Sequence, residues 1–237
     1  MFADLHAHIL FDIDDGPETI EASIALLEKA VADGIDSIVA TPHFYASMHS
    51  LDERVTLANK RFEALKNEMA KRNIPIKEFL LGYEVRYFKG ISNTEEIDKL
   101  CINGSRYLLL ELGQIAITED VIDDIMGLIY SGYTVIFAHL ERYTKNPGFK
   151  ELKKIISENH IPVQVTAVSF IEKPFQRASY RLLKEGLVTF LSSDMHDALI
   201  RAPKMTEAVR EISKQIAPDV AQTLIKKGNE FFEKIKR

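Results

Sequence analysis

The sequence predicts an α/β fold in which parallel strands alternate with helices to form a barrel-like sheet. Short apolar runs rich in β-branched residues alternate along the chain with longer segments of helical period. No linker rich in proline, glycine or serine and no internal repeat divides the chain, so we expect a single domain over residues 1–237. An open, doubly wound sheet would give the same alternation, so periodicity alone does not decide whether the sheet closes.

Seven strands are expected, one fewer than in the common eight-stranded barrel. Each is a short apolar run bounded by turn residues or by a segment of helical period. The expected strands are Phe2–His8, Asp36–Thr41, Lys77–Glu84, Arg106–Leu112, Tyr133–His139, Ile161–Thr166 and Leu187–Ser193.

The helix after the first strand carries both start and stop signals. Asp15 or Gly16 can cap its amino end, and Pro17 suits its first turn. Gly34 suits its end, because glycine adopts a left-handed cap at little cost. Its apolar stripe consists of Ile20, Ile24, Leu27 and Val31. Further helices are expected over Leu51–Arg72, Thr118–Ser131, Lys150–Asn159, Phe175–Lys184, Pro203–Ile216 and Asp219–Lys236.

Composition indicates an ordinary globular protein, with 46% hydrophobic and 27% charged residues. The net charge of −5 argues against a general nucleic-acid binder, although it leaves room for a local basic patch. No apolar run reaches the roughly 20 residues that cross a bilayer, and the amino terminus lacks the pattern of a signal peptide. The single cysteine, Cys101, fits a reducing compartment. We therefore expect a cytoplasmic protein without membrane insertion and without a nucleic-acid partner.

Histidines and carboxylates gather where the predicted strands end. In parallel α/β folds the carboxyl ends of the strands form the functional face. Five of the seven histidines fall there, and only His49 and His160 lie in loops elsewhere. The residues expected on this rim are His6, His8, His43, Glu84, Glu111, His139, Asp194 and His196.

These residues predict a metal centre. His6 and His8 flank Ala7, so both side chains point to the same side of the first strand and can bind one ion, with Glu84 or Asp194 completing its shell. A single histidine would be interpreted as a hydrogen-bonded polar residue. Five histidines with several carboxylates in one barrel mouth, however, are costly to bury unless they are paired or bound to metal.

The acidic segment from Asp12 to Gly16 has two interpretations. Asp15 before Gly16 and Pro17 can cap the following helix. One aspartate, with Asp15 preferred over Asp14, can instead be a further metal ligand. Capping and ligation can also share this segment.

Two arginines are expected above the same rim. Arg142 follows His139 by three residues, and Arg201 follows Asp194 by seven. The planar guanidinium fork suits phosphate oxygens, and a multi-metal centre suits phosphoryl transfer to water. Without the metal cluster, a solvated or structurally paired arginine would be the preferred interpretation of each.

Thiolate catalysis finds no support around Cys101. The phosphate loop of cysteine phosphatases has histidine before the cysteine and arginine six positions after it, where this chain has Leu100 and Tyr107. Cys101 is therefore expected to be a buried or inert thiol. The chain also lacks a Gly-x-Ser-x-Gly elbow and a P-loop.

With these residues placed, the sequence resembles the polymerase and histidinol phosphatase (PHP) superfamily, and within it the bacterial protein-tyrosine phosphatases of the CpsB/YwqE type. The matching segments occur in family order over most of the chain. They are Asp4–Leu10, Asp14–Pro17, Ala40–His43, Gly82–Glu84, Leu110–Glu111, Ala138–Tyr143 and Ser193–His196.

The resemblance implies a distorted seven-stranded (β/α) barrel of TIM-like type with two or three divalent transition-metal ions, manganese first and iron or zinc as alternatives. By analogy, His6, His8, Glu84 and Asp194 hold one ion, Glu84, Glu111 and His139 the second, and Asp15, His43 and His196 the third. Arg142 and Arg201 match the family's phosphate-binding arginines. In such enzymes a metal-bound hydroxide attacks phosphorus and the tyrosyl oxygen leaves.

The resemblance also implies a substrate, the phosphorylated tyrosine-rich tail of a bacterial tyrosine autokinase that controls capsule or exopolysaccharide synthesis. One departure is Thr166, where many relatives carry asparagine. Two alternatives stay open: a small-molecule phosphatase of histidinol-phosphate type, and a noncatalytic metal-binding scaffold that docks a kinase. The segments Asp14–Pro17 and His139–Tyr143 favour the tyrosine-phosphatase branch.

Overall fold

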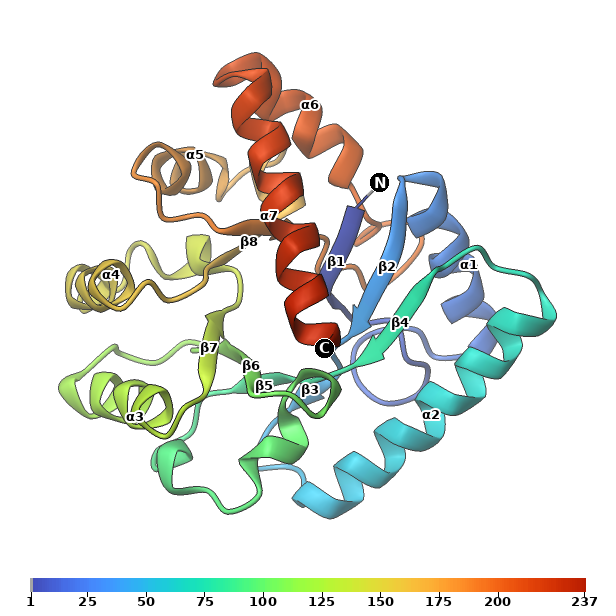
Figure 1. The fold of residues 1–237 in the computed structure, drawn as a ribbon, viewed down its shortest axis with the longest axis horizontal. Coiled ribbons are helices and arrows are strands. Elements are labelled where there is room, and N and C mark those ends of the chain that lie inside the picture. The colour runs from blue at the N-terminus through green and yellow to red at the C-terminus, as the bar shows by residue number, and fades with distance from the viewer. Residues whose placement is uncertain (1) are drawn as a thin grey trace.

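Parallel strands lie at the centre of the structure and helices surround them (Figure 1). This computed structural model describes residues 2–237. The strands form three sheets, in the orders β1-β2-β4, β3-β5-β6-β7 and β8-β9, and every pairing is parallel. The strands are β1 Phe2–Ala7, β2 Ile35–Ala40, β3 His43–Phe44, β4 Glu78–Leu81, β5 Glu84–Arg86, β6 Tyr107–Glu111, β7 Thr134–Phe137, β8 Gln164–Thr166 and β9 Phe190–Ser192.

The parallel α/β class is therefore confirmed, whereas one continuous sheet of seven strands is not what the described residues form. The expected strand Asp36–Thr41 corresponds to β2, and the short strand β3 that follows Thr41 and Pro42 was not predicted. The third expected run, Lys77–Glu84, is interrupted at Gly82 and divides into β4 and β5. Pro42 lacks an N–H group for a ladder bond. A Cβ atom on Gly82 would lie 2.7 Å from Cγ1 of Ile102, so this crossing point leaves room only for glycine.

At Pro42 and again at Gly82 the chain passes from one sheet into the next. β2 pairs with β1 and β4, whereas β3 pairs with β5 in the second sheet. Isolated bridges between Ala7 and Met195 and between Phe137 and Val163 join the sheet ends to their neighbours. The carboxyl ends of β1, β3, β6, β7 and β9 consequently open toward one region of the molecule.

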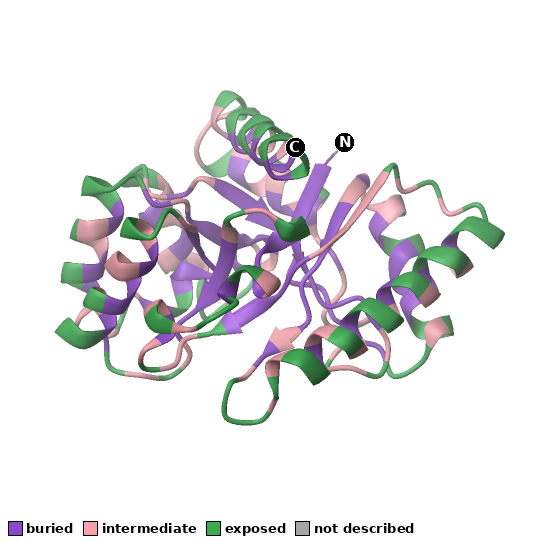
Figure 2. Cartoon of the chain, turned by 60° about the horizontal axis from the view of Figure 1, so that its bottom comes forward, coloured by how far each residue is buried: buried purple, intermediate pink, exposed green. Residues whose placement is uncertain are grey.

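Seven α-helices lie outside the strands within residues 2–237. They are α1 Ile20–Ala32, α2 Leu51–Lys71, α3 Glu119–Tyr130, α4 Phe149–Glu158, α5 Gln176–Lys184, α6 Met205–Gln215 and α7 Pro218–Lys236. Short 3₁₀ segments include η4, Leu140–Tyr143, and η5, Ala167–Phe170. Figure 2 shows most of the strands buried and the helices exposed on their outer faces, whereas β4 is of intermediate burial. The helix α7 packs against β1, where the N–H of Ala3 donates to Oδ1 of Asn229 at 2.9 Å.

The start of α1 differs from the prediction. Thr19, and not Asp15 or Gly16, is the N-cap, and its side chain accepts a hydrogen bond from the N–H of Ala22 at 3.2 Å. The acidic segment before it is used elsewhere, as described below. The predicted end is confirmed, because Gly34 has φ +91° just after the helix.

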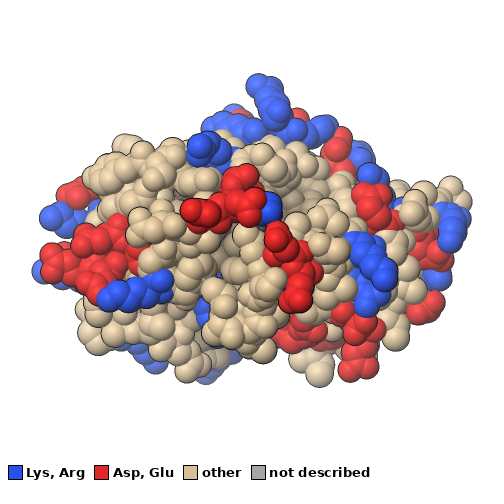
Figure 3. All heavy atoms as spheres, turned by 90° about the horizontal axis from the view of Figure 1, so that it is seen from below, with Lys and Arg blue, Asp and Glu red and all other residues tan. Residues whose placement is uncertain are grey.

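Burial separates the core from the remaining surface features. Cys101 is buried as expected, and its thiol donates to the carbonyl oxygen of Ile97. Burial raises the pKa of this thiol to about 12, so it stays protonated at neutral pH. Acidic and basic side chains are interspersed on the face shown in Figure 3. Among residues 2–237, no helix is both long and apolar enough to cross a membrane.

Candidate metal centre

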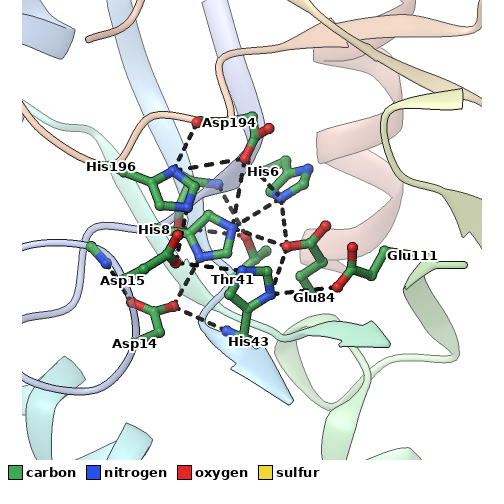
Figure 4. A network of polar contacts seen from close by, with 12 residues as sticks. His6, His8, Asp14, Asp15, Thr41, His43, Glu84, Glu111, Asp194 and His196 are labelled. Carbon is green, nitrogen blue, oxygen red and sulfur yellow. Dashed lines mark hydrogen bonds and ion pairs between the residues drawn. The ribbon is translucent and has the colours of Figure 1, made fainter. Parts of the chain in front are cut away.

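The structure brings the nine candidate ligands together at the carboxyl ends of the strands, and all of them except His139 are labelled in Figure 4. Three overlapping groups have potential ligand atoms within 4.8 Å of one another: His8, Asp15, His43 and His196; His6, His8 and Asp194; His43, Glu84 and Glu111. His139 lies outside these groups but adjoins them. Its Nε2 atom is 2.6 Å from Oε1 of Glu84 and 3.7 Å from Oε2 of Glu111.

The first strand supplies the centre of the cluster. His6 and His8 are wholly buried and point to the same side of β1, with their Nε2 atoms 3.1 Å apart. Oε2 of Glu84 lies 3.3 Å from Nε2 of His6 and 3.1 Å from Nε2 of His8. Oδ1 of Asp194 lies 3.5 Å and 3.7 Å from the same two nitrogens. Alternation along β1 thus places two imidazoles between two carboxylates.

An outer group lies nearer the solvent. Nε2 of His196 is 3.2 Å and Nε2 of His43 is 3.5 Å from Oδ1 of Asp15, whose side chain is 56% exposed. The rings of His8 and His196 stack with their centroids 3.9 Å apart. The acidic segment before α1 therefore folds over the ends of β1 and β3.

Two residues of the cluster hold a backbone conformation that side chains other than glycine seldom adopt. His139 has φ +35° and Asp194 has φ +53°. Such conformations cost about 1–3 kcal/mol each and persist where the surroundings enforce them. Here the N–H of Asp194 donates to the carbonyl oxygen of His6 at 2.9 Å, and that of His139 donates to Oε1 of Gln164 at 2.6 Å. These bonds turn both side chains inward.

Asp14 and Asp15 take different positions. Oδ2 of Asp14 accepts hydrogen bonds from Nδ1 of His8 at 2.8 Å and from the N–H of His43 at 3.0 Å, and Oδ1 accepts from the N–H of Gly16 at 3.0 Å. Burial alone would raise the pKa of Asp14, but the charge and hydrogen bond of His8 hold it at about 2. Asp14 is thus an ionised acceptor that orients His8. Asp15, by contrast, faces the open side of the cluster.

Gln164 and Tyr143 orient two further imidazoles, and the sequence did not reveal these roles. Oε1 of Gln164, in β8, lies 3.2 Å from Nδ1 of His6. The hydroxyl of Tyr143 lies 3.2 Å from Nδ1 of His139 and accepts from the N–H of Leu112 at 3.1 Å. With Nδ1 protonated, each histidine donates outward and turns the lone pair of Nε2 into the cluster. The spacing of four residues between His139 and Tyr143 was the one available signal.

Asp4 and Arg54 fix the backbone around the cluster and were also missed. Asp4 is wholly buried and accepts from the N–H of Ser193 at 3.0 Å, which ties β1 to the segment that carries Asp194. Arg54 reaches in from α2 and donates to the carbonyl oxygens of His43 at 2.8 Å and Ile13 at 2.5 Å. An aspartate within an apolar strand, two residues before His6, could have drawn attention to Asp4.

The polar atoms of the cluster fit bound cations. Burial would raise the pKa of Glu84, yet His6 and His139 keep it well below its ordinary range, so its carboxylate is charged. Nδ1 of His43 and Nε2 of His196 are buried and make no well-aligned hydrogen bond among the described residues, although each faces a carboxylate oxygen, Oε2 of Glu84 at 2.9 Å and Oδ1 of Asp15 at 3.2 Å. Opposed imidazole nitrogens and charged carboxylates together form the mixed nitrogen and oxygen donor set of divalent transition metals.

Arg142 and Arg201 reach the cluster from different strand ends. Nη2 of Arg142 donates to Oδ2 of Asp194. Arg201 places Nη1 3.0 Å from Oδ2 of Asp15 and Nη2 3.5 Å from Oδ1 of Asp194. The carboxylate of Asp197 accepts from the N–H of Arg201 at 3.0 Å and holds this loop. The two arginine side chains are 37% and 40% exposed, so an incoming anion can reach both.

A parallel α/β fold with a buried histidine and carboxylate cluster, flanked by two accessible arginines, defines the class of metal-dependent phosphoesterases. Comparison with known proteins gives the particular family. A model of the family described as "Capsular polysaccharide synthesis, CpsB/CapC" matches residues 2–232. The chain belongs to the CpsB/CapC family, as the resemblance predicted.

Curated relatives span nearly the whole chain. The tyrosine-protein phosphatase CpsB of Streptococcus agalactiae serotype III (strain NEM316) is 29% identical over 230 residues, which cover 93% of each chain. The tyrosine-protein phosphatase YwqE of Bacillus subtilis (strain 168) is 26% identical over 225 residues, which cover 93% of this chain and 87% of the relative.

Solved structures agree with this assignment. One described as YwqE from Bacillus subtilis and CpsB from Streptococcus pneumoniae, unique metal-dependent tyrosine phosphatases, has a TM-score of 0.86 and 25% identity, covering 98% of this chain and 94% of the other. The lactonase Lmo2620 from Listeria monocytogenes, at 11% identity and a TM-score of 0.59, shares the fold alone.

Proposed function

We propose that this protein is a metal-dependent phosphatase that hydrolyses phosphotyrosine in proteins. The observation that carries the proposal is the buried cluster around Glu84 with Arg142 and Arg201 at its open side. Membership of the CpsB/CapC family, whose curated relatives are named tyrosine-protein phosphatases, supports the substrate class.

The cluster would hold two or three divalent ions, and manganese is the metal that we propose first. One ion would take His6, His8, Glu84 and Asp194; a second would take Glu84, Glu111 and His139; a third would take Asp15, His43 and His196. Bound ions supply Lewis acidity that activates water and offsets charge on the phosphoryl oxygens. Because Nδ1 of His43 lies 2.9 Å from Oε2 of Glu84, His43 would also lie beside the residues that hold the second ion.

The two arginines bind and orient the phosphoryl group. Each guanidinium presents a planar fork. The two approach Asp194 from different segments of the chain, Arg142 from η4 and Arg201 from the loop after β9. An arriving phosphate would compete with Asp194 and Asp15 for these forks, so the arginines are held in place before substrate binds. Their donors stabilise equatorial oxygens as charge grows in the transition state.

The proposed substrate is the phosphorylated, tyrosine-rich tail of a bacterial tyrosine kinase that controls capsule or exopolysaccharide synthesis, met in the cytoplasm. The capsular description of the family supports this proposal. We also propose that the three sheets act as one distorted seven-stranded barrel. The bridges Ala7–Met195 and Phe137–Val163 support it, because they continue the strand order across two sheet boundaries.

The test uses the chelated full chain, reloaded with Mn²⁺, Fe²⁺ or Zn²⁺ under matched conditions. We expect no hydrolysis of a phosphotyrosine peptide after chelation, restoration by Mn²⁺, and two or three ions per chain by elemental analysis. Histidinol phosphate, assayed in parallel, tests the small-molecule alternative through its kcat/KM. Metal binding without turnover of either substrate would favour the scaffold, and chelator-resistant activity would refute the metal mechanism.

A further inference from the structure

A cationic groove runs along helix α5. It has a volume of 980 Å³ and lies between α5, the segment after η4 and the end of α6. Four exposed cations line it: Lys145, Arg177, Arg181 and Lys184. Within residues 2–237, none of the four forms an ion pair with a carboxylate. The acidic residue that lines the groove, Glu185, is already paired with Lys153 at 3.2 Å.

Helical geometry explains why three of these charges share one wall. Arg177, Arg181 and Lys184 are spaced by four and three residues on α5, so they project from the same face. The opposite face of α5 buries Leu182 and Ser179 against the core. Scattered surface cations need no ligand, since water solvates them. Four unpaired cations in one hollow of a protein with net charge −5, however, make a local field that attracts anions.

The groove adjoins a cavity beside Arg142. Pro174 lines both the groove and a smaller cavity of 230 Å³, whose walls include Glu141, Arg142 and Thr166. The helix α5 also packs against η4, the 3₁₀ segment that carries Arg142. A polypeptide that places a phosphotyrosine between Arg142 and Arg201 can therefore extend past Pro174 into the groove.

We propose that this groove binds an anionic segment of the phosphotyrosine-bearing polypeptide, recognising carboxylates or a second phosphate away from the reacting one. This inference rests on the proposed function. Arg177 and Arg181 offer planar forks for such oxygens, and Lys145 and Lys184 add mobile point charges. Because these charges are exposed and lie away from the reacting phosphate, they speed association with the substrate and strengthen its binding but do not act in the chemical step. They should therefore lower KM and leave kcat unchanged. The groove would let an acidic protein select an acidic substrate.

The test compares Arg177→Glu/Arg181→Glu with the parent, both as manganese-loaded full chains. Substrates are a phosphotyrosine peptide with glutamates or a second phosphotyrosine in its flank, the same peptide with neutral flanks, and p-nitrophenyl phosphate. For the acidic peptide we expect KM to rise about 10-fold with kcat retained, on the scale of reversing two exposed charges. The parent's preference for this peptide should vanish near ~0.5 M salt. Neither effect should appear with p-nitrophenyl phosphate, which is too small to reach the groove.

Lys226→Glu/Lys227→Glu is the matched control, because it makes the same change in net charge on exposed residues of α7. An equal rise in KM for this control would show that only net charge matters and would overturn the proposal. So would an unchanged KM for the acidic peptide, or an equal loss on all three substrates. Co-sedimentation with phosphatidylglycerol vesicles that is lost in Arg177→Glu/Arg181→Glu while peptide kinetics stay unchanged would assign the groove to membranes instead.

Fluorescence anisotropy of the labelled acidic peptide separates the two proposals, since it requires no turnover. Weaker binding by Arg177→Glu/Arg181→Glu supports the proposed role of the groove, even if the parent protein hydrolyses nothing. Absence of hydrolysis by the parent would refute the proposed function alone. Equal binding by parent and variant refutes the groove, whatever the activity.

Discussion

Replacing Asp14 by asparagine should weaken metal binding without removing a ligand. The carboxylate accepts hydrogen bonds from His8, His43 and Gly16 through both of its oxygens. Asparagine keeps one acceptor oxygen. If that oxygen accepts from His8 and His43, the new NH₂ group faces the N–H of Gly16, and two donors cannot form a hydrogen bond. The negative charge that Asp14 places beside His8 is also lost.

The size of the effect follows from the bond that is lost. A hydrogen bond to a charged group contributes about 1.5–3 kcal/mol. At ~1.4 kcal/mol per tenfold change, Asp14→Asn should lower metal affinity ~10- to 100-fold, the range found for groups that orient metal-bound histidines. Asp14→Ala removes both oxygens, so its loss of metal affinity should reach or exceed the upper end of this range. Saturating Mn²⁺ should restore most of kcat, because the ligands themselves remain.

Calorimetric titration with Mn²⁺ and activity in metal buffers would measure this shift on one preparation. Asp12→Asn is the control, since Asp12 lies on the same loop but pairs with Arg61 at the surface. Its φ of +50° suits asparagine. Parent-like affinity in Asp14→Asn would refute the orienting role. A loss of kcat that excess metal does not restore would instead place Asp14 in the chemistry.

Four further predictions concern other parts of the site and the thiol. Arg142→Ala and Arg201→Ala should each lower kcat/KM on phosphotyrosine peptides by ~10- to 1000-fold at parent metal content, with poor rescue by lysine; metal loss in step with activity would make them structural. Gly16→Ala should reduce metal content in elemental analysis, because its Cβ would lie 2.8 Å from the carbonyl oxygen of His8, and full occupancy would contradict this. Cys101→Ser should stay within a few-fold of parent turnover. In the folded parent, iodoacetamide at neutral pH should leave Cys101 unmodified, because its pKa of about 12 keeps it protonated; rapid labelling seen by mass spectrometry would count against the burial described.

Much of the fold and the site was predictable because the signals are local. Alternation along β1 puts His6 and His8 on one side, and the end of each apolar run marks the functional edge of a parallel sheet. The helices begin and end within a few residues of their predicted bounds, as with α2 at Leu51–Lys71. The predicted start of α1 was wrong because Asp15, a good capping residue by type, contacts the imidazole of His196 instead, and Thr19 caps the helix.

The sequence by itself determined which residues stand at the strand ends, since that depends on side-chain type and on the period of the backbone. Only the tertiary structure decided how those residues are held. His6 is oriented by Gln164, 158 positions away, and Asp194 is turned inward by a bond to the carbonyl oxygen of His6, across a similar separation. The start of a new strand after Pro42 and the division of the expected strand at Gly82 likewise depend on which sheet each segment meets. Hydrogen bonds of this kind are directional and need partners within about 3 Å, so distant chain segments must be in place before their geometry exists.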